Sequence, residues 1–182
     1  MTKQELFNEG VKYVTEFCKV NNIKMPKIVA KDNKSYFPAP CGFYNSRNQT
    51  IYVCIEKCSY EVNNPGYRWS HRHYFADREP CGVVCHEFGH YLHHILTNCK
   101  LVLPRERKIT SYEPNNNERF AETIKLFMLN PDLLKQYDPK RYDIIVNVLK
   151  LKPIIYTDWK TTFGNNINEK FINACKTKLN KK

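Results

Sequence analysis

The sequence predicts an α+β fold with one N-terminal helix, a small mixed sheet, a long central helix and a helical C-terminal lobe. Three observations support this fold class. Apolar residues recur at helical spacing in the first 20 residues and in the last third of the chain, and short β-prone runs lie between residues 27 and 55. A third signal is an apolar segment with helix-start features near residue 80. With 182 residues and no internal repeat, residues 1–182 are expected to form a single domain.

The N-terminal elements are predicted from capping and turn signals. Thr2 and Glu5 match a capping box, and the apolar residues that follow predict a helix over about residues 3–20. Three β-prone runs come next and are predicted to be strands, the last two as a hairpin: Lys27–Ala30, Gly42–Tyr44 and Thr50–Ile55. The aromatic-rich segment Glu56–Glu79 has no periodicity and is predicted to be a long connection.

The remaining elements are predicted to be helices. Pro80 is a typical first-turn residue, and the apolar run as far as Asn98 predicts a long buried helix. Asn115–Asn117 offer capping residues for another helix, which should stop at Asn130 because Pro131 follows. Shorter helical segments are expected in three further places: Asp132–Gln136, 138–149 and 166–179.

Composition limits the class of protein. No apolar stretch is long enough to cross a bilayer, and the N-terminus has no apolar segment typical of a secretory signal, so a cytoplasmic protein with eight reduced cysteines is expected. The net charge of +11 favours weak association with nucleic acid or an anionic surface. The basic residues are spread along the chain, however, and a solvated surface explains them. The protein is expected to be a monomer.

The predicted central helix contains the motif H-E-x-x-H at residues 86–90. On a helix, His86 and His90 lie on one face and can share a metal ion, for which Zn²⁺ is the expected cofactor. Glu87 would lie beside the metal, where it can take a proton from a zinc-activated water and pass it to a leaving amine. Such a short motif also occurs by chance, but its place in a long apolar helix favours a metal site.

A catalytic zinc ion needs a third protein ligand and an open position. One class of zinc hydrolase uses a histidine ten residues after the first, but Leu96 occupies that position. His94 is two turns from His86 and lies too far along the helix axis. The remaining source is the next helix, where Glu118 and Glu122 lie four residues apart on one face.

Other residues match metal ligands by type alone. His71 and His73, in the predicted long connection, are additional metal-ligand candidates only by residue type. Four cysteines could form a structural zinc site, although their spacing is wider than is typical: Cys54, Cys58, Cys81 and Cys85.

The motif residues resemble those of a known family. H-E-F-G-H at 86–90, followed by Thr110–Tyr112 and by E-R-F-A-E at 118–122, is similar to the gluzincin metallopeptidases, most closely the anthrax-lethal-factor-like catalytic domains. Similar motifs occur in the ImmA/IrrE-type regulatory peptidases. The resemblance covers about residues 83–128, with one residue fewer between Tyr112 and the first glutamate than in the family.

The resemblance implies a zincin-like fold and a role for each motif residue. Glu118 would be the third zinc ligand, Glu122 would support a zinc-bound histidine, and Tyr112 would stabilise the oxyanion. Glu118 is also nearer than Glu122 to the start of the helix. The segment Asn115–Asn117 is expected to enter this helix from the side of the zinc site.

The predicted function is therefore zinc-dependent hydrolysis of peptide bonds by an endopeptidase, with a protein or peptide as substrate. An extended substrate would pair with residues 50–55 if they form the sheet edge along the cleft, which makes Tyr52, Val53 and Cys54 the candidate substrate-binding residues. The alternative is a regulatory or nucleic-acid-associated protein with a zincin fold and little or no peptidase activity. Glu87 favours catalysis, because a site without catalysis needs no carboxylate beside the metal.

Overall fold

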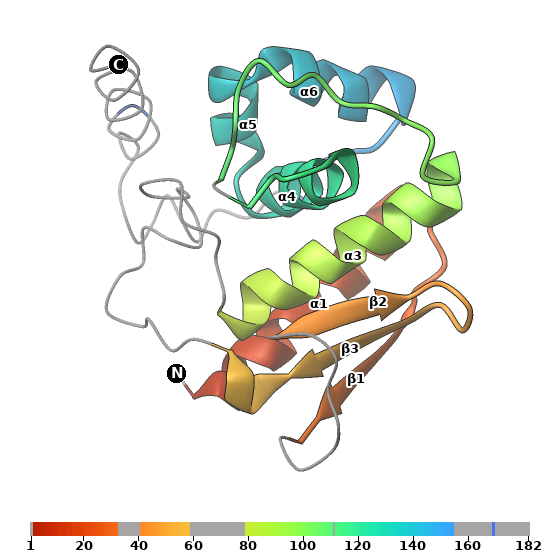
Figure 1. Ribbon diagram of the computed structural model, residues 1–182, viewed down its shortest axis with the longest axis vertical. Helices are drawn as coiled ribbons and strands as arrows, with labels where there is room; N and C mark the ends of the chain where they lie inside the picture. The colour runs from red at the N-terminus through yellow and green to blue at the C-terminus, as the bar shows by residue number, and fades with distance from the viewer. Residues whose placement is uncertain (1, 33–40, 59–78, 111, 155–168, 170–182) are drawn as a thin grey trace.

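A three-stranded mixed sheet and a set of helices around one long central helix make up the α+β fold of the computed structural model (Figure 1). The structure describes residues 2–32, 41–58, 79–110, 112–154 and 169. The predicted fold class is confirmed. Most of the predicted 56–79 connection, including His71 and His73, lies outside the described residues, and so does the predicted helix over 166–179 except for Glu169.

Helix α1 spans Lys3–Asn21 and forms where the capping signal predicts it. The Thr2 hydroxyl accepts a hydrogen bond from the Glu5 backbone N–H at 3.2 Å, and the Glu5 carboxylate accepts one from the Thr2 N–H at 2.6 Å. These two bonds satisfy N–H groups that a helix start leaves without partners. The helix ends at Asn22, which adopts the left-handed conformation with φ of 52°.

The sheet consists of β1 (Lys27–Lys31), β2 (Gly42–Asn45) and β3 (Thr50–Cys54) in the order β1-β3-β2. β2 and β3 form the predicted antiparallel hairpin, whereas β1 pairs with β3 in parallel. β3 is therefore the central strand, and the condition for substrate pairing with residues 50–55, that they form the sheet edge along the cleft, is not met. Both sides of β3 are paired, and its residues are buried except for the half-buried Tyr52.

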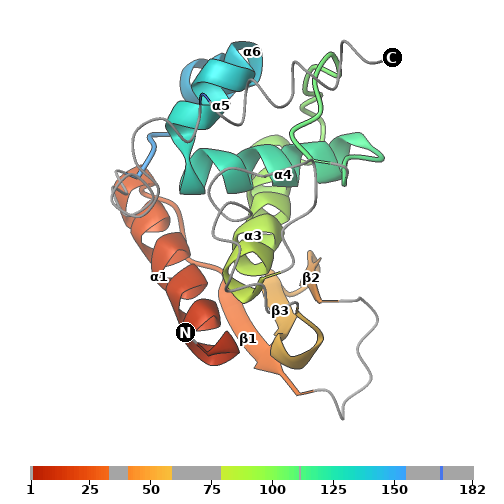
Figure 2. The ribbon, with the colours of Figure 1, turned by 90° about the vertical axis from the view of Figure 1, so that its left-hand side faces the viewer.

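Helix α3 spans Pro80–Thr97 and is the element around which the described fold is arranged. It packs against α1, α4, β2 and β3, and its residues are buried on almost every side as far as His93. Figures 1 and 2 show α3 between the sheet on one side and the C-terminal helices on the other. Its first residue is the predicted Pro80, and it ends before Asn98, which has φ of 48°.

The described C-terminal part is helical, as predicted: α4 (Asn116–Leu129), α5 (Pro131–Tyr137), α6 (Pro139–Asp143) and a short π-helical turn, η3 (Ile144–Val148). Each of α4, α5 and α6 begins after a residue whose side chain accepts a hydrogen bond from the third backbone N–H of the helix: Asn115, Asn130 and Asp138. None of the described helices combines the length and the apolar character that crossing a bilayer would require.

A buried ionic cluster attaches the connection between α3 and α4 to the C-terminal helices. The Arg141 guanidinium, with no exposed surface, lies 3.1 Å from Glu113 and 3.1 Å from Asp138, and it donates to the Thr123 hydroxyl at 3.1 Å. Glu113 in turn accepts a hydrogen bond from the Ile109 backbone N–H at 2.6 Å. The connection that carries Tyr112 is thus held by charged groups that have been removed from water.

Candidate metal centre

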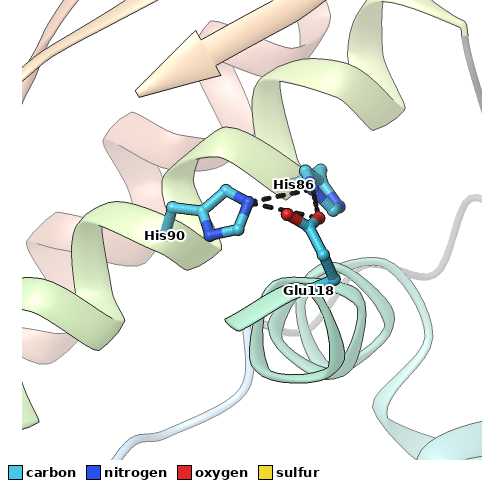
Figure 3. Close-up of side chains that lie close together, drawn as sticks. All are labelled: His86, His90 and Glu118. Carbon is cyan, nitrogen blue, oxygen red and sulfur yellow. Dashed lines mark hydrogen bonds and ion pairs between the residues drawn. The ribbon is translucent and has the colours of Figure 1, made fainter. Parts of the chain in front are cut away.

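The side chains of His86, His90 and Glu118 converge where α3 faces the start of α4 (Figure 3). The two histidines are one helical turn apart, and their Nε2 atoms are 3.1 Å from each other. The nearer carboxylate oxygen of Glu118 lies 3.0 Å from Nε2 of His86 and 3.4 Å from Nε2 of His90. Within the described ranges, no other group of three histidine, cysteine or acidic side chains is placed to hold a metal ion.

The spacing of these three atoms fits a zinc ion. In a tetrahedral site with bonds of about 2.0 to 2.2 Å, neighbouring ligand atoms are about 3.3 to 3.6 Å apart. The observed separations of 3.0, 3.1 and 3.4 Å agree to within a few tenths of an ångström. Two imidazoles and one carboxylate are also a donor set typical of catalytic zinc. The residues present therefore make a candidate metal site, and they fit zinc.

Glu122 holds His86 from the side opposite this site. Its carboxylate lies 2.6 Å from Nδ1 of His86, and it accepts hydrogen bonds at 2.9 Å from the ammonium group of Lys125. The Glu122 and Lys125 side chains are buried. A carboxylate at Nδ1 keeps a proton on that nitrogen, so that Nε2, which faces His90 and Glu118, is the nitrogen that can bind a metal ion. Glu122 thus contacts the ring nitrogen of His86 that faces away from His90 and Glu118.

The same contacts shift the pKa values of two site residues in opposite directions. Burial alone would lower the pKa of His86, but its hydrogen bonds to Glu118 and Glu122 outweigh burial and raise the pKa to about 9. Burial would raise the pKa of Glu118, yet its hydrogen bonds with His86 and His90 lower it to about 2. A positive charge, from a proton or a metal ion, is therefore strongly favoured between these groups.

Glu87 lies beside the histidines and is almost fully buried between α3 and β2. Burial raises its pKa, while the charges of the two neighbouring histidines and a hydrogen bond from the Tyr44 backbone N–H oppose this effect. Strand β2 approaches Glu87 closely because Gly42 has no side chain: a Cβ atom on Gly42 would lie 3.1 Å from Cγ of Glu87. A buried carboxyl group with a raised pKa, next to the candidate metal ligands, is suited to proton transfer.

A cleft of about 390 Å³ opens in front of these residues. Its walls come from β2, from α3 and from the start of α4, and the residues that line it include Phe43, His90, Tyr112 and Asn117. Tyr112 is 47% exposed, and its ring centre is 5.7 Å from that of His86. The structure therefore brings Tyr112 to the cleft, on the exposed side of the histidines.

The strand along this cleft is β2, which the sequence did not identify as part of the site. Cys41 and Cys54 form a hydrogen-bonded pair at the end of the β2–β3 ladder. The backbone N–H of Cys54 donates to the carbonyl of Cys41, with 2.8 Å between the nitrogen and the oxygen. Bonded and non-bonded pairs alternate along an antiparallel ladder, so the backbone groups of Gly42 and Tyr44 point away from β3. The signal that could have identified β2 is Gly42, because a glycine at the start of a strand often marks a close backbone approach.

The remaining sequence candidates lie elsewhere. Val53 and Cys54 are buried in the central strand, and the ring of Tyr52 stacks on Phe43 at 5.0 Å. His94, which sequence spacing placed too far from His86, has Nδ1 2.8 Å from the Tyr44 hydroxyl. Four described cysteines that were considered for a structural zinc site are buried and do not gather into a metal-binding group: Cys54, Cys58, Cys81 and Cys85.

Comparisons with known proteins give no relative: no protein-family model matches the chain, and no curated protein or solved structure is significantly similar to it. The resemblance to gluzincins is thus limited to the motif residues themselves. The assignment of the site depends on its own geometry and chemistry.

Proposed function

We propose that this protein is a zinc-dependent endopeptidase. The observation that carries the proposal is the convergence of His86, His90 and Glu118 at tetrahedral spacing, with the buried carboxyl group of Glu87 beside them and an open cleft in front. Metal ligands alone would suit many binding proteins. A carboxyl group of raised pKa next to the ligands is the feature that favours hydrolysis.

His86, His90 and Glu118 would hold the zinc ion, and Glu122 would fix the ring of His86 so that Nε2 faces the metal. When bound, zinc supplies Lewis acidity that activates water and polarises a peptide carbonyl. Glu87 would take a proton from the attacking water and deliver it to the leaving amine, and its raised pKa makes the carboxylate a stronger base for the first of these two transfers.

Tyr112 is proposed to donate a hydrogen bond to the oxygen on which negative charge develops. Its ring lies at the cleft, 5.7 Å from that of His86 between ring centres, and about half of the side chain is accessible to a substrate. A donor aimed at the developing charge is worth about 3 to 4 kcal/mol in comparable sites.

The substrate is proposed to bind in an extended conformation along β2. The backbone groups of Gly42 and the Tyr44 carbonyl, which point away from β3, are on the cleft side, where an added peptide strand could pair with them. The Tyr44 N–H is already bonded to the Glu87 carboxyl group. This proposal replaces Tyr52, Val53 and Cys54 as substrate-binding residues, because β3 already has a partner on each side.

The experiment that tests the function is cleavage of a mixed peptide library by the wild-type protein and by Glu87→Gln at equal zinc content. The variant should keep its zinc and its fold and lose most of its turnover, because only proton transfer is removed. Glu16→Gln, at an exposed position on α1, is the matched control and should cleave like the wild type. Wild-type turnover in zinc-loaded Glu87→Gln would exclude Glu87 as the base.

The second candidate is a regulatory or nucleic-acid-binding protein, favoured by the net charge of +11. It predicts salt-dependent binding to DNA or RNA and no cleavage of any peptide in the library. Binding with cleavage would leave the peptidase proposal in place, whereas binding without cleavage would replace it.

A further inference from the structure

Helices α3 and α4 touch through their backbones at Gly89 and Ala121. A Cβ atom on Gly89 would lie 2.6 Å from Cα of Ala121 and 2.9 Å from its carbonyl oxygen. Carbon atoms in favourable contact are about 3.5 to 4.0 Å apart, so no side chain fits at this position. The obstacle is backbone, which cannot move aside by changing a rotamer as a flexible side chain would.

This contact lies between the residues of the candidate metal site. Gly89 is in the turn of α3 that joins His86 to His90, and Ala121 is in the turn of α4 that joins Glu118 to Glu122. Both glutamates reach His86 from this crossing, Glu118 at 3.0 Å from Nε2 and Glu122 at 2.6 Å from Nδ1.

The metal site tolerates little change in this spacing. Metal–ligand distances hold to within about 0.2 Å in a well-formed site. Relieving a 2.6 Å contact with Ala121 requires α4 to shift by about 1 Å to reach normal contact distance. A shift of that size would carry Glu118 and Glu122 away from His86 together, because both lie on the helix that moves.

We propose that Gly89 is a positioning residue for the metal: by lacking a side chain, it sets the α3–α4 distance at which the histidine pair and the glutamate pair can hold one ion. The inference rests on the metal site of the proposed function and adds a residue that contacts neither metal nor substrate. Its role is separate from helix formation, since Gly→Ala within a helix normally stabilises it by up to about 1 kcal/mol.

The test is the zinc dissociation constant of Gly89→Ala, measured by competition with a chromophoric chelator. Zinc should bind at least tenfold more weakly than to the wild type, in line with the usual effect of residues that orient metal ligands. The visible absorption of the Co²⁺-substituted protein should also lose the intensity typical of tetrahedral sites. Circular dichroism and the Tm of the metal-free protein report whether the variant is folded.

Gly10→Ala is the matched control, because it makes the same substitution at another close helix contact. A Cβ atom on Gly10 would lie 2.9 Å from Cβ of Val84 and 3.0 Å from Cα of Cys81, which places the strain between α1 and α3. This variant should lower the Tm of the metal-free protein and leave the zinc affinity and the cobalt spectrum unchanged.

Three outcomes would overturn the inference. They are wild-type zinc affinity in Gly89→Ala, an equal loss of affinity in Gly10→Ala, and failure of Gly89→Ala to fold, since the glycine would then be a requirement of the fold and not of the site. Failure of the proposed function is recognised separately. In that case the wild-type protein itself would bind no zinc, or His86→Ala would bind it equally well.

Discussion

At the scale of single residues, His86 is the side chain that contacts both glutamates of the site. Each ring nitrogen faces a carboxylate, Nδ1 at 2.6 Å from Glu122 and Nε2 at 3.0 Å from Glu118. Without a metal ion, a proton on each nitrogen satisfies both carboxylates, which explains why the pKa is raised to about 9 in spite of burial. With a metal ion, the proton on Nε2 must leave. Protons and metal therefore compete for the same atom.

This competition predicts how zinc binding depends on pH. Because the pKa of His86 in the metal-free fold is raised to about 9, zinc must displace a proton at any lower pH. Zinc affinity should rise by up to about tenfold per pH unit between pH 6 and 8, with release of about one proton per zinc ion, measurable by chelator competition and calorimetry in buffers of different ionisation enthalpy. Affinity independent of pH in this range would contradict the prediction.

The same shifts predict the stability of the metal-free protein. The pKa of His86 is raised above its ordinary value of 6.5. Its contribution to the free energy of unfolding is therefore complete below pH 6.5 and is lost as the pH rises through 9. The pKa of Glu118 is lowered from 4.5 to about 2. Its contribution to the free energy of unfolding is therefore complete above pH 4.5 and is lost as the pH falls through about 2. Urea unfolding of the metal-free protein should therefore show highest stability between about pH 4.5 and 6.5.

The roles of the two glutamates can also be separated. Glu118→Ala removes an atom that faces both histidines, and zinc affinity should fall by far more than 100-fold. Glu122→Ala removes only the partner of Nδ1, and affinity should fall about 10- to 100-fold. Competition titration against a chelator measures both variants. A larger loss of zinc affinity in Glu122→Ala than in Glu118→Ala would mean that the two assignments must be exchanged.

His86→Ala and His90→Ala, assayed by elemental analysis, should hold no zinc.

At the scale of elements, the start of α4 links helix capping to metal binding. The Asn115 side chain accepts a hydrogen bond from the backbone N–H of Glu118 at 3.0 Å, so the cap holds the residue that carries the third ligand. Asn115→Ala should cost about 0.5 to 2 kcal/mol in the free energy of unfolding and should also weaken zinc binding, whereas Asn115→Asp should preserve both.

Thr2→Ala is the matched control for this capping effect. It removes the equivalent bond in α1, from the Glu5 N–H at 3.2 Å, on a helix that supplies none of the candidate ligands. Its cost in stability, measured by urea unfolding, should be similar, and its zinc affinity should equal that of the wild type. Equal zinc affinities in Asn115→Ala and Thr2→Ala would show that capping of α4 does not influence the site.

At the scale of the whole molecule, the buried cluster around Arg141 joins three successive segments of the C-terminal half of the described chain. It connects the segment of Glu113 with α4 and α6, and it contains charges that have no exposed surface. Arg141→Met leaves Glu113 and Asp138 without their shared partner. The free energy of unfolding should fall by about 3 to 5 kcal/mol, as measured with urea.

A consequence for the site follows, because Tyr112 directly precedes Glu113. Arg141→Met should lower peptide turnover more than it lowers zinc affinity, since the ligands on α3 and α4 keep their own contacts. Lys140→Met is the control: its ion pair with Glu106 spans 3.0 Å on the exposed surface and should contribute less than about 1 kcal/mol. Unchanged stability in Arg141→Met would mean that the cluster does not hold the connection.

Local rules accounted for most elements and for the histidine pair. The capping box of α1, the hairpin of β2 and β3, and the helices ended by Asn98 and Pro131 all depend on residues close in sequence, so the sequence alone predicts them. The same holds for His86 and His90, because one helical turn fixes their separation.

Only the tertiary structure decided what depends on contacts between distant segments. The sequence could not show that β1 would pair with β3 and leave β2 along the cleft, because strand order is set by how a whole sheet packs against its helices. The distance between Glu118 and the histidines was undetermined for the same reason. It follows from how closely α3 and α4 approach at Gly89, and such an approach depends on the absence of atoms, which no periodicity reveals.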